Sequence, residues 1–259
     1  MHHHIQIEGT AFEPTVTILL ITAFLLYLIA AIITSRKYKI WPIYRYFFWG
    51  LGLFCVALSL VGPLAAFAHT NFVGHMFGHL LLGMLAPLLL LLATPMTLLL
   101  RSLKVKNARR ITGVLKSRPI QFINNPVTAS ILNIGGLYVL YTTDLYLFMH
   151  QSLFFYMLIH LHVFLAGYLF TISIIYIDIT PHRYSHLYRA IVLVLALAGH
   201  KVLSKHIYAT PPSSVPRIEA EIGSMWMYYG GDVVDLSLII ILCYQWYKAT
   251  APRTIKHAN

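Results

Sequence analysis

The chain has 259 residues, of which 58% are hydrophobic and only 10% are charged, and its mean hydropathy is +0.71. This composition excludes a water-facing globular surface and predicts an all-α, polytopic membrane protein of the cell membrane. The formal net charge is +11, but the basic residues are scattered through loops between apolar runs, which argues against nucleic-acid binding. The chain also has 14 histidines against eight acidic residues.

Seven apolar stretches are candidates to cross the roughly 30 Å hydrocarbon core of a bilayer. In chain order they cover residues 16–34, 47–67, 77–100, 127–141, 153–177, 188–208 and 225–247. The fourth is the weakest, because it is short and contains Asn133, Gly135 and Gly136. We therefore expect an N-terminal segment over residues 1–15, a seven-helix domain over 16–247 and a tail over 248–259.

The basic residues predict how these helices are oriented. Sixteen Lys and Arg residues lie in the connections after the first, third and fifth stretches and in the tail, whereas Lys201, Lys205 and Arg217 alone lie on the opposite side. Because positive charge accumulates on the cytoplasmic side, we expect an extracytoplasmic N-terminus and a cytoplasmic C-terminus.

Most histidines then fall near the outer side of the membrane. This group consists of His69, His75, His79, His150, His160, His162, His200 and His206. His75 and His79 are four residues apart, so one helix face presents both imidazoles within reach of a single ion. His160 and His162 are about 200° apart around a helix, so at most one of them faces a given site. The run His2 to His4 is either native or a tag remnant.

Other side chains at the same depth suggest which metal these histidines would bind. Met76 and Met225 supply thioethers, and Asp232, with Asp235 three residues later, is placed to accept an imidazole N–H and fix its tautomer. Imidazole with thioether and no thiolate favours copper, whereas imidazole with carboxylate would equally suit zinc or iron. The simpler alternative is that the histidines only hydrogen-bond neighbouring helices, which explains a single histidine better than a convergent set.

Four blocks of sequence resemble the multi-span CtaG family of cytochrome c oxidase assembly factors. They are GHMFGHLLL at 74–82 with LAPLLL at 85–90 and ATPMTL at 93–98, HLHVFLAGYLF at 160–170 with IDITP at 177–181, GH at 199–200, and GSMWM at 223–227 with GGD at 230–232. Two positions depart from the family pattern. Glu219-Ala220-Glu221 replaces an Asp-Gln pair, and Thr171-Ile172 stands where a Trp is common.

The resemblance implies a seven-helix membrane protein, not an enzyme, that helps to mature a haem–copper oxidase by supplying copper to its membrane-embedded subunit. On this hypothesis the ligands would be His75 and His79, joined by His160 or His162 and by His200. Met76 or Met225 would be a soft ligand, and Asp232 would be an outer acceptor. Three alternatives remain: a haem-binding protein that oxidises quinol, a proton-coupled transporter and a metal-free scaffold for nascent oxidase subunits.

Overall fold

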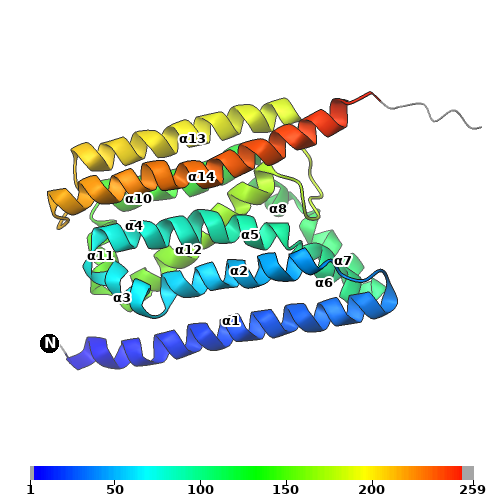
Figure 1. Cartoon of the computed structure of the whole chain (residues 1–259), viewed down its shortest axis with the longest axis horizontal. Helices are drawn as coiled ribbons and strands as arrows, with labels where there is room; N and C mark the ends of the chain where they lie inside the picture. Colours follow the sequence, from blue (N-terminus) through cyan, green and yellow to red (C-terminus); the bar gives the residue numbers. More distant parts are fainter. Residues whose placement is uncertain (1–2, 253–259) are drawn as a thin grey trace, which may run out of the picture.

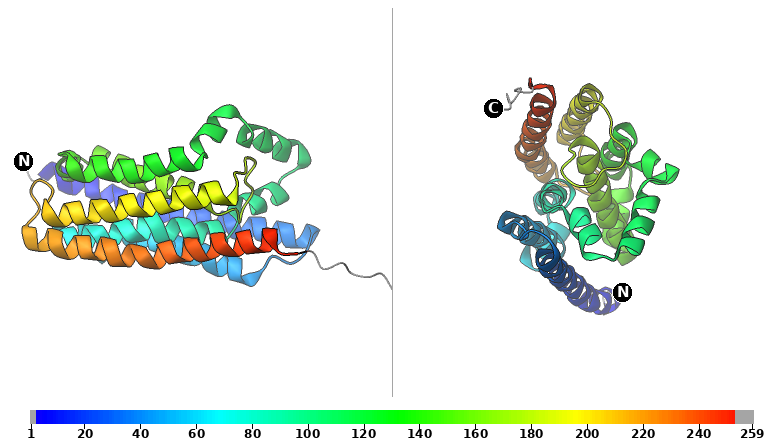
Figure 2. Two further views of the ribbon diagram at one scale, coloured as in Figure 1. Left: turned by 90° about the horizontal axis from the view of Figure 1, so that it is seen from above. Right: turned by 90° about the vertical axis from the view of Figure 1, so that its right-hand side faces the viewer.

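The computed structural model describes residues 3–252, with side chains from residue 12 onward, and every regular element in that range is a helix. The imidazoles of His2 to His4 and the tail beyond residue 252 lie outside the described parts. Within this described range six helices are long and apolar enough to span a membrane, and the number is seven if one bent helix pair counts as a span. The long helices run side by side along the longest axis of the molecule (Figures 1 and 2). The protein is therefore a multi-pass membrane protein.

The first helix, α1 (His3–Lys37), lies at the edge of the bundle and packs against α2 (Ile43–Leu60) and α6 (Pro95–Ser102) (Figure 1). A buried tyrosine fixes it there. The hydroxyl of Tyr27 donates to the carbonyl oxygen of Ala93 at 2.8 Å and accepts from the indole N–H of Trp41 at 3.0 Å. A hydrogen-bonded tyrosine supplies the polar contact that two apolar membrane helices otherwise lack.

The second predicted stretch, 47–67, is wrong as a single helix. Helix α2 ends at Leu60, the chain turns at Gly62, and α3 (Pro63–Thr70) follows as a separate short helix. Gly62 has a φ of 81°, which glycine adopts at little cost. Pro63 has no backbone N–H and fits the first position of a new helix better than the interior of an old one.

The third predicted stretch, 77–100, is also divided. It begins earlier, with α4 (Phe72–Leu80), continues through the π-helical turn η1 (Leu81–Leu85) and ends with α5 (Ala86–Leu92). Helix α6 then begins at Pro95, directly after Thr94, whose φ is 52°. The N-terminus of α6 is capped from another segment, because the carboxylate of Asp178 accepts the N–H groups of Met96 at 2.7 Å and Thr97 at 2.8 Å.

The fourth stretch contains a second π-helical turn, η2 (Ile131–Gly135), between α9 (Pro126–Ser130) and α10 (Gly136–Thr142). Helix α11 (Leu145–Gln151) follows, and the axis bends by 79° at the break before it. The seventh crossing therefore depends on a short, irregular helix, which accounts for its weak signal in the sequence.

The last three spans are regular. They are α12 (Leu153–Ile174), α13 (His186–Ala209) and α14 (Arg217–Thr250), the last of which starts about two turns before the predicted 225–247. Helices α13 and α14 pack along their length (Figure 1). The buried Arg189 of α13 donates to the carbonyl oxygen of Ile174 at 2.6 Å and to Oε1 of Gln245 at 3.1 Å, which joins all three helices.

The two ends of the bundle differ in composition. One end carries α3, α11 and the connection between α13 and α14, and we call it the histidine end (Figure 1). The opposite end carries α6 and two connecting helices, α7 (Val105–Leu115) and α8 (Arg118–Ile123), which contain Lys106, Arg109, Arg110 and Arg118 (Figure 2). Between the two ends the buried side chains form two main apolar clusters, one around Met76 and Tyr141 and one around Leu91 and Ile174.

Candidate functional site

A small cavity lies where the two apolar clusters meet, and we call it the inner cavity. Its volume is about 20 Å³, which is room for about one water molecule or one metal ion. Most of its wall is apolar. The side chains in it that offer nitrogen, oxygen or sulfur near the space are His79, Met84, Asn133, Thr171, His200 and Asp235. These residues come from five segments of the chain, which the fold brings together.

The two imidazoles of the inner cavity face each other across the bundle, His79 from α4 and His200 from α13. Their ring centroids are 6.1 Å apart, and the two residues are 6% and 3% exposed. Both ring nitrogens of His79 and Nε2 of His200 are buried without a hydrogen-bond partner in the protein. Leaving a buried polar atom unpaired costs about 1 to 3 kcal/mol, so such atoms mark a site where a ligand would bind favourably.

Both π-helical turns line the inner cavity. Gly83 and Met84 belong to η1, and Asn133 and Ile134 belong to η2. Each such turn holds one residue more than an α-helical turn and interrupts the regular ladder, and these turns are frequent at functional sites.

A second cavity, which we call the outer cavity, adjoins the same histidine. Its volume is about 10 Å³, and His75, His79, Tyr141 and His160 line it. The centroids of His75 and His160 are 6.3 Å apart, and Nε2 of His75 lies 3.0 Å from the hydroxyl oxygen of Tyr141. Since His79 also lines the inner cavity, it connects the two spaces.

The tautomer of His160 follows from its backbone contact. Its Nδ1 lies 2.8 Å from the carbonyl oxygen of Tyr156, and a carbonyl oxygen can only accept, so Nδ1 carries the proton. In the neutral ring the lone pair is then on Nε2. Metal-binding histidines commonly donate their second N–H to a carbonyl in this way.

Two further histidines continue the group toward the histidine end. His69 of α3 and His150 of α11 have ring centroids 6.0 Å apart, and His150 is 6.4 Å from His75. His69 is exposed and stacks on the ring of Tyr156 at 4.6 Å. Partial burial lowers the pKa of His69 from its ordinary value of 6.5, although Glu13 opposes the shift.

Three of the predicted ligands point away from both cavities. His162 is exposed, and its Nε2 lies 3.2 Å from the carbonyl oxygen of Leu132, as expected if His160 occupies the opposite face of α12. Met76 is fully buried on the side of α4 that packs against Gly223. Met225 is 44% exposed. Within residues 12–252, no group of three or more His, Cys, Asp or Glu side chains is arranged around one point where an ion would sit.

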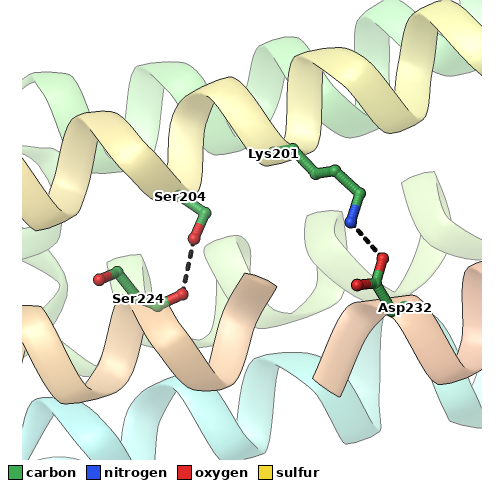
Figure 3. Close-up of polar contacts among 4 residues, drawn as sticks. All are labelled: Lys201, Ser204, Ser224 and Asp232. Atoms are coloured by element: carbon green, nitrogen blue, oxygen red, sulfur yellow. Dashed lines mark hydrogen bonds and ion pairs between the residues drawn. The ribbon is translucent and has the colours of Figure 1, made fainter. Parts of the chain in front are cut away.

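Asp232, the predicted outer acceptor, forms an ion pair with Lys201 (Figure 3). Their side chains are 45% and 29% exposed, so the pair lies at the side of the α13–α14 interface. About one turn from Lys201 along α13, the hydroxyl of Ser204 donates to the carbonyl oxygen of Ser224 at 2.6 Å, as Figure 3 also shows. It is Asp235, only 4% exposed, that reaches the inner cavity.

The contribution of the Lys201–Asp232 ion pair to stability can be predicted without reference to any metal. Asp232→Asn removes the carboxylate partner of Lys201, whose ammonium keeps its contact with the Tyr228 ring at 4.1 Å, so we expect a loss of about 0.5 to 1 kcal/mol in stability. The exchanged pair Lys201→Asp/Asp232→Lys should recover most of that loss, because the attraction is restored. Thermal unfolding of the detergent-solubilised variants measures both. Equal loss in the single and the exchanged variants would contradict the assignment.

Three residues that line the cavities were not among the predicted ligands: Tyr141, Asn133 and Met84. Met84 is the methionine that lines the inner cavity. A signal existed for Asn133, because an amide within an apolar stretch is costly unless it has a role. No comparable signal distinguished Met84 from Met76, which lies next to His75 in the sequence.

Comparison with known proteins identifies the family of this chain. The profile of the cytochrome c oxidase caa3 assembly factor family matches residues 25–249. The chain belongs to this family. The matched region contains both cavities and all the helices that line them. No solved structure matches the chain.

Several relatives in this comparison are longer proteins. Uncharacterised proteins of Mycobacterium bovis and Mycobacterium tuberculosis are each 32% identical over 155 residues, which is 57% of this chain and 23% of the relative. An uncharacterised protein of Mycobacterium leprae is 27% identical over 248 residues, or 86% of this chain and 38% of the relative. The chain therefore spans well under half the length of these relatives.

Proposed function

We propose that this assembly factor holds one copper ion, as Cu(I), between His79 and His200 and delivers it to the membrane-embedded subunit of a haem–copper oxidase. The observation that carries the proposal is the pair of buried, unpartnered imidazoles beside a cavity with room for one ion. Copper is here the cargo of the protein. The family supplies the partner class, because its members assemble cytochrome c oxidase.

The spacing of the two rings is compatible with one ion bound between them. With metal–nitrogen bonds of about 2 Å, an ion in line between two imidazoles places their centroids about 6 Å apart, whereas a tetrahedral angle brings them to about 5 Å. His79 and His200 are at 6.1 Å. Cu(I) accepts two-coordinate geometry, which zinc does not favour, and Met84 adds a soft thioether to the same cavity.

The other hypotheses receive less support. A haem macrocycle is far larger than a cavity of about 20 Å³, so the inner cavity favours an ion over haem. A proton pathway across the membrane would need ionisable groups along its whole length. A metal-free scaffold gives no reason for unpartnered nitrogens on two facing helices.

We further propose that the histidine end faces the extracytoplasmic side. Sixteen of the 19 Lys and Arg residues occur in the connections and tail assigned to the opposite side. Since positive charge marks the cytoplasmic side, copper would be taken up and released at the outer surface.

Copper binding is tested with the purified full chain, loaded with Cu(I) under reducing conditions against a competing chelator. We expect about one tightly held ion, and His79→Gln or His200→Gln should weaken it by more than 100-fold, since even indirect partners of a metal contribute about 10- to 100-fold. His206→Gln, exposed and outside both cavities, is the matched control. Unchanged affinity in both cavity variants, or no copper bound by the unaltered protein, would overturn the proposal.

A further inference from the structure

The histidines of this protein form a continuous series from the surface to the inner cavity. Successive ring centroids are 6.0 Å apart for His69 and His150, 6.4 Å for His150 and His75, and 6.3 Å for His75 and His160. The outer cavity joins this group to His79, and His200 follows at 6.1 Å. The segments that contribute are far apart in sequence, from α3 to α13.

The series runs from an exposed end to a buried end, although His160 is less buried than His75, which precedes it. His69 is exposed at the histidine end, and His150 and His160 are partly buried. His75, His79 and His200 are buried, and His200 is the least exposed of all. One end of the series is therefore open to an ion outside the bundle, and the other end lies beside the inner cavity.

Ring nitrogens are free for a ligand at several positions in the series. Nε2 of His150 is buried without a hydrogen-bond partner, as are the ring nitrogens of His79 and Nε2 of His200. His160 keeps the lone pair of Nε2, because its Nδ1 donates to a carbonyl oxygen. A structural imidazole would normally have its buried nitrogens paired, so this distribution favours ligand binding over packing.

The spacing suits transfer better than storage. Four of the neighbouring pairs have centroid separations of 6.0 to 6.4 Å, which are compatible with an ion shared between two imidazoles, and His160 and His79 line one cavity. In residues 12–252 no third His, Cys, Asp or Glu completes a closed group that would trap the ion. An ion held by two ligands is open to attack by a third.

Building on the proposed copper function, we propose that His69 and His150 form a receiving site for Cu(I), from which His75 and His160 pass the ion to His79 and His200. Each step is a ligand exchange. A new bond forms between copper and the next imidazole nitrogen as the bond to the previous nitrogen breaks. The imidazoles stay neutral and the copper stays Cu(I), so neither a proton nor an electron is transferred.

Loading kinetics test this path separately from copper binding. Cu(I) is presented to the full chain in detergent from a coloured chelator complex, and the loss of colour gives the rate. We expect His69→Gln/His150→Gln to load at least about ten times more slowly than the unaltered protein, while the affinity of the inner pair at equilibrium is unchanged. His206→Gln, an exposed histidine outside the series, is the matched control and should load at the normal rate.

The outcomes are distinguishable. If the unaltered protein binds no copper, the proposed function fails and the path fails with it. If it binds copper and the double variant loads at the normal rate, the path is overturned while the inner site stands. The single variant His69→Gln is the control for misfolding, because His69 is exposed and its replacement should not disturb the fold. This variant should still load copper more slowly than the unaltered protein. A normal rate in that variant would also contradict the receiving role of His69.

Discussion

Gly167→Ala is expected to destabilise this protein by more than about 3 kcal/mol, at or beyond the upper end of ordinary overpacking. A Cβ atom at Gly167 of α12 would lie 2.0 Å from the carbonyl oxygen of Gly83 and 2.9 Å from its carbonyl carbon. Both are backbone atoms of η1, so no side-chain rotation relieves the clash. Helix α12 would have to move away from η1, and His160 would move away from His75 with it.

Two measurements check this expectation. The midpoint of thermal unfolding in detergent should fall sharply in Gly167→Ala, and bound copper should fall with it. Gly78→Ala is the matched control, because Gly78 lies in α4 and a Cβ there would meet nothing within 4 Å. That variant should be neutral or gain up to about 1 kcal/mol, since alanine favours helix. Similar losses in the two variants would show that the close approach of α12 is not critical.

Asp178→Ala should have an effect of similar size, a loss of about 3 to 5 kcal/mol. The Asp178 carboxylate accepts backbone N–H groups of Met96, Thr97 and its neighbour Ile179, and also the hydroxyl of Thr97. Hydrogen bonds to a charged group contribute about 1.5 to 3 kcal/mol each, and these are not additive. Asp178 is 3% exposed, so the abandoned donors would not be hydrated easily.

Asp178→Ala should also change the structure locally, around the start of α6. Helix α6 would lose its N-terminal cap, and the adjacent contact of Trp41 with Tyr27 would loosen, so tryptophan emission should shift to longer wavelength. Asp178→Asn keeps one acceptor oxygen and should lose about half as much stability. Asp144→Ala removes an exposed carboxylate that accepts a single hydroxyl hydrogen bond, and it should change stability by less than about 0.5 kcal/mol. If Asp178→Ala behaves like Asp144→Ala, the capping role is wrong.

The helical membrane fold could be predicted because length and hydropathy alone decide it, and the last three spans were placed well. The breaks within the apolar stretches were harder to predict from the sequence. Gly62-Pro63 and Thr94-Pro95 each carry a turn signal, but both occur within apolar runs that still satisfy the length of a span. The π-helical turn η1 did have a signal in Pro87, which lacks a backbone N–H and cannot bond the carbonyl oxygen of Gly83 four residues earlier. The close approach of Gly167 to that same carbonyl could not be predicted, because it depends on the packing of α12.

The candidate site was predictable in part for a similar reason. The spacing of His75 and His79 fixes their common face, and a two-residue spacing makes His160 and His162 diverge. What no local pattern reveals is which face of an apolar helix points inward. Helix α12 is apolar on nearly every side, so only the packing of other helices selects His160. The same ambiguity made Met76 and Asp232 as plausible as Met84 and Asp235.

The π-helical turn η1 also sets the rotation of α4 relative to α5. An extra residue in a helical turn rotates everything before it by about 100° relative to everything after it. Helix α5, after the turn, packs against α2 and α12, whereas α4, before it, packs against α14 and α3. Deleting one residue of η1 would keep the helix and its hydropathy but change its phase, so His75 and His79 would turn from the cavities toward a different neighbour. The alignment of the imidazoles is therefore determined by a single residue of helical register.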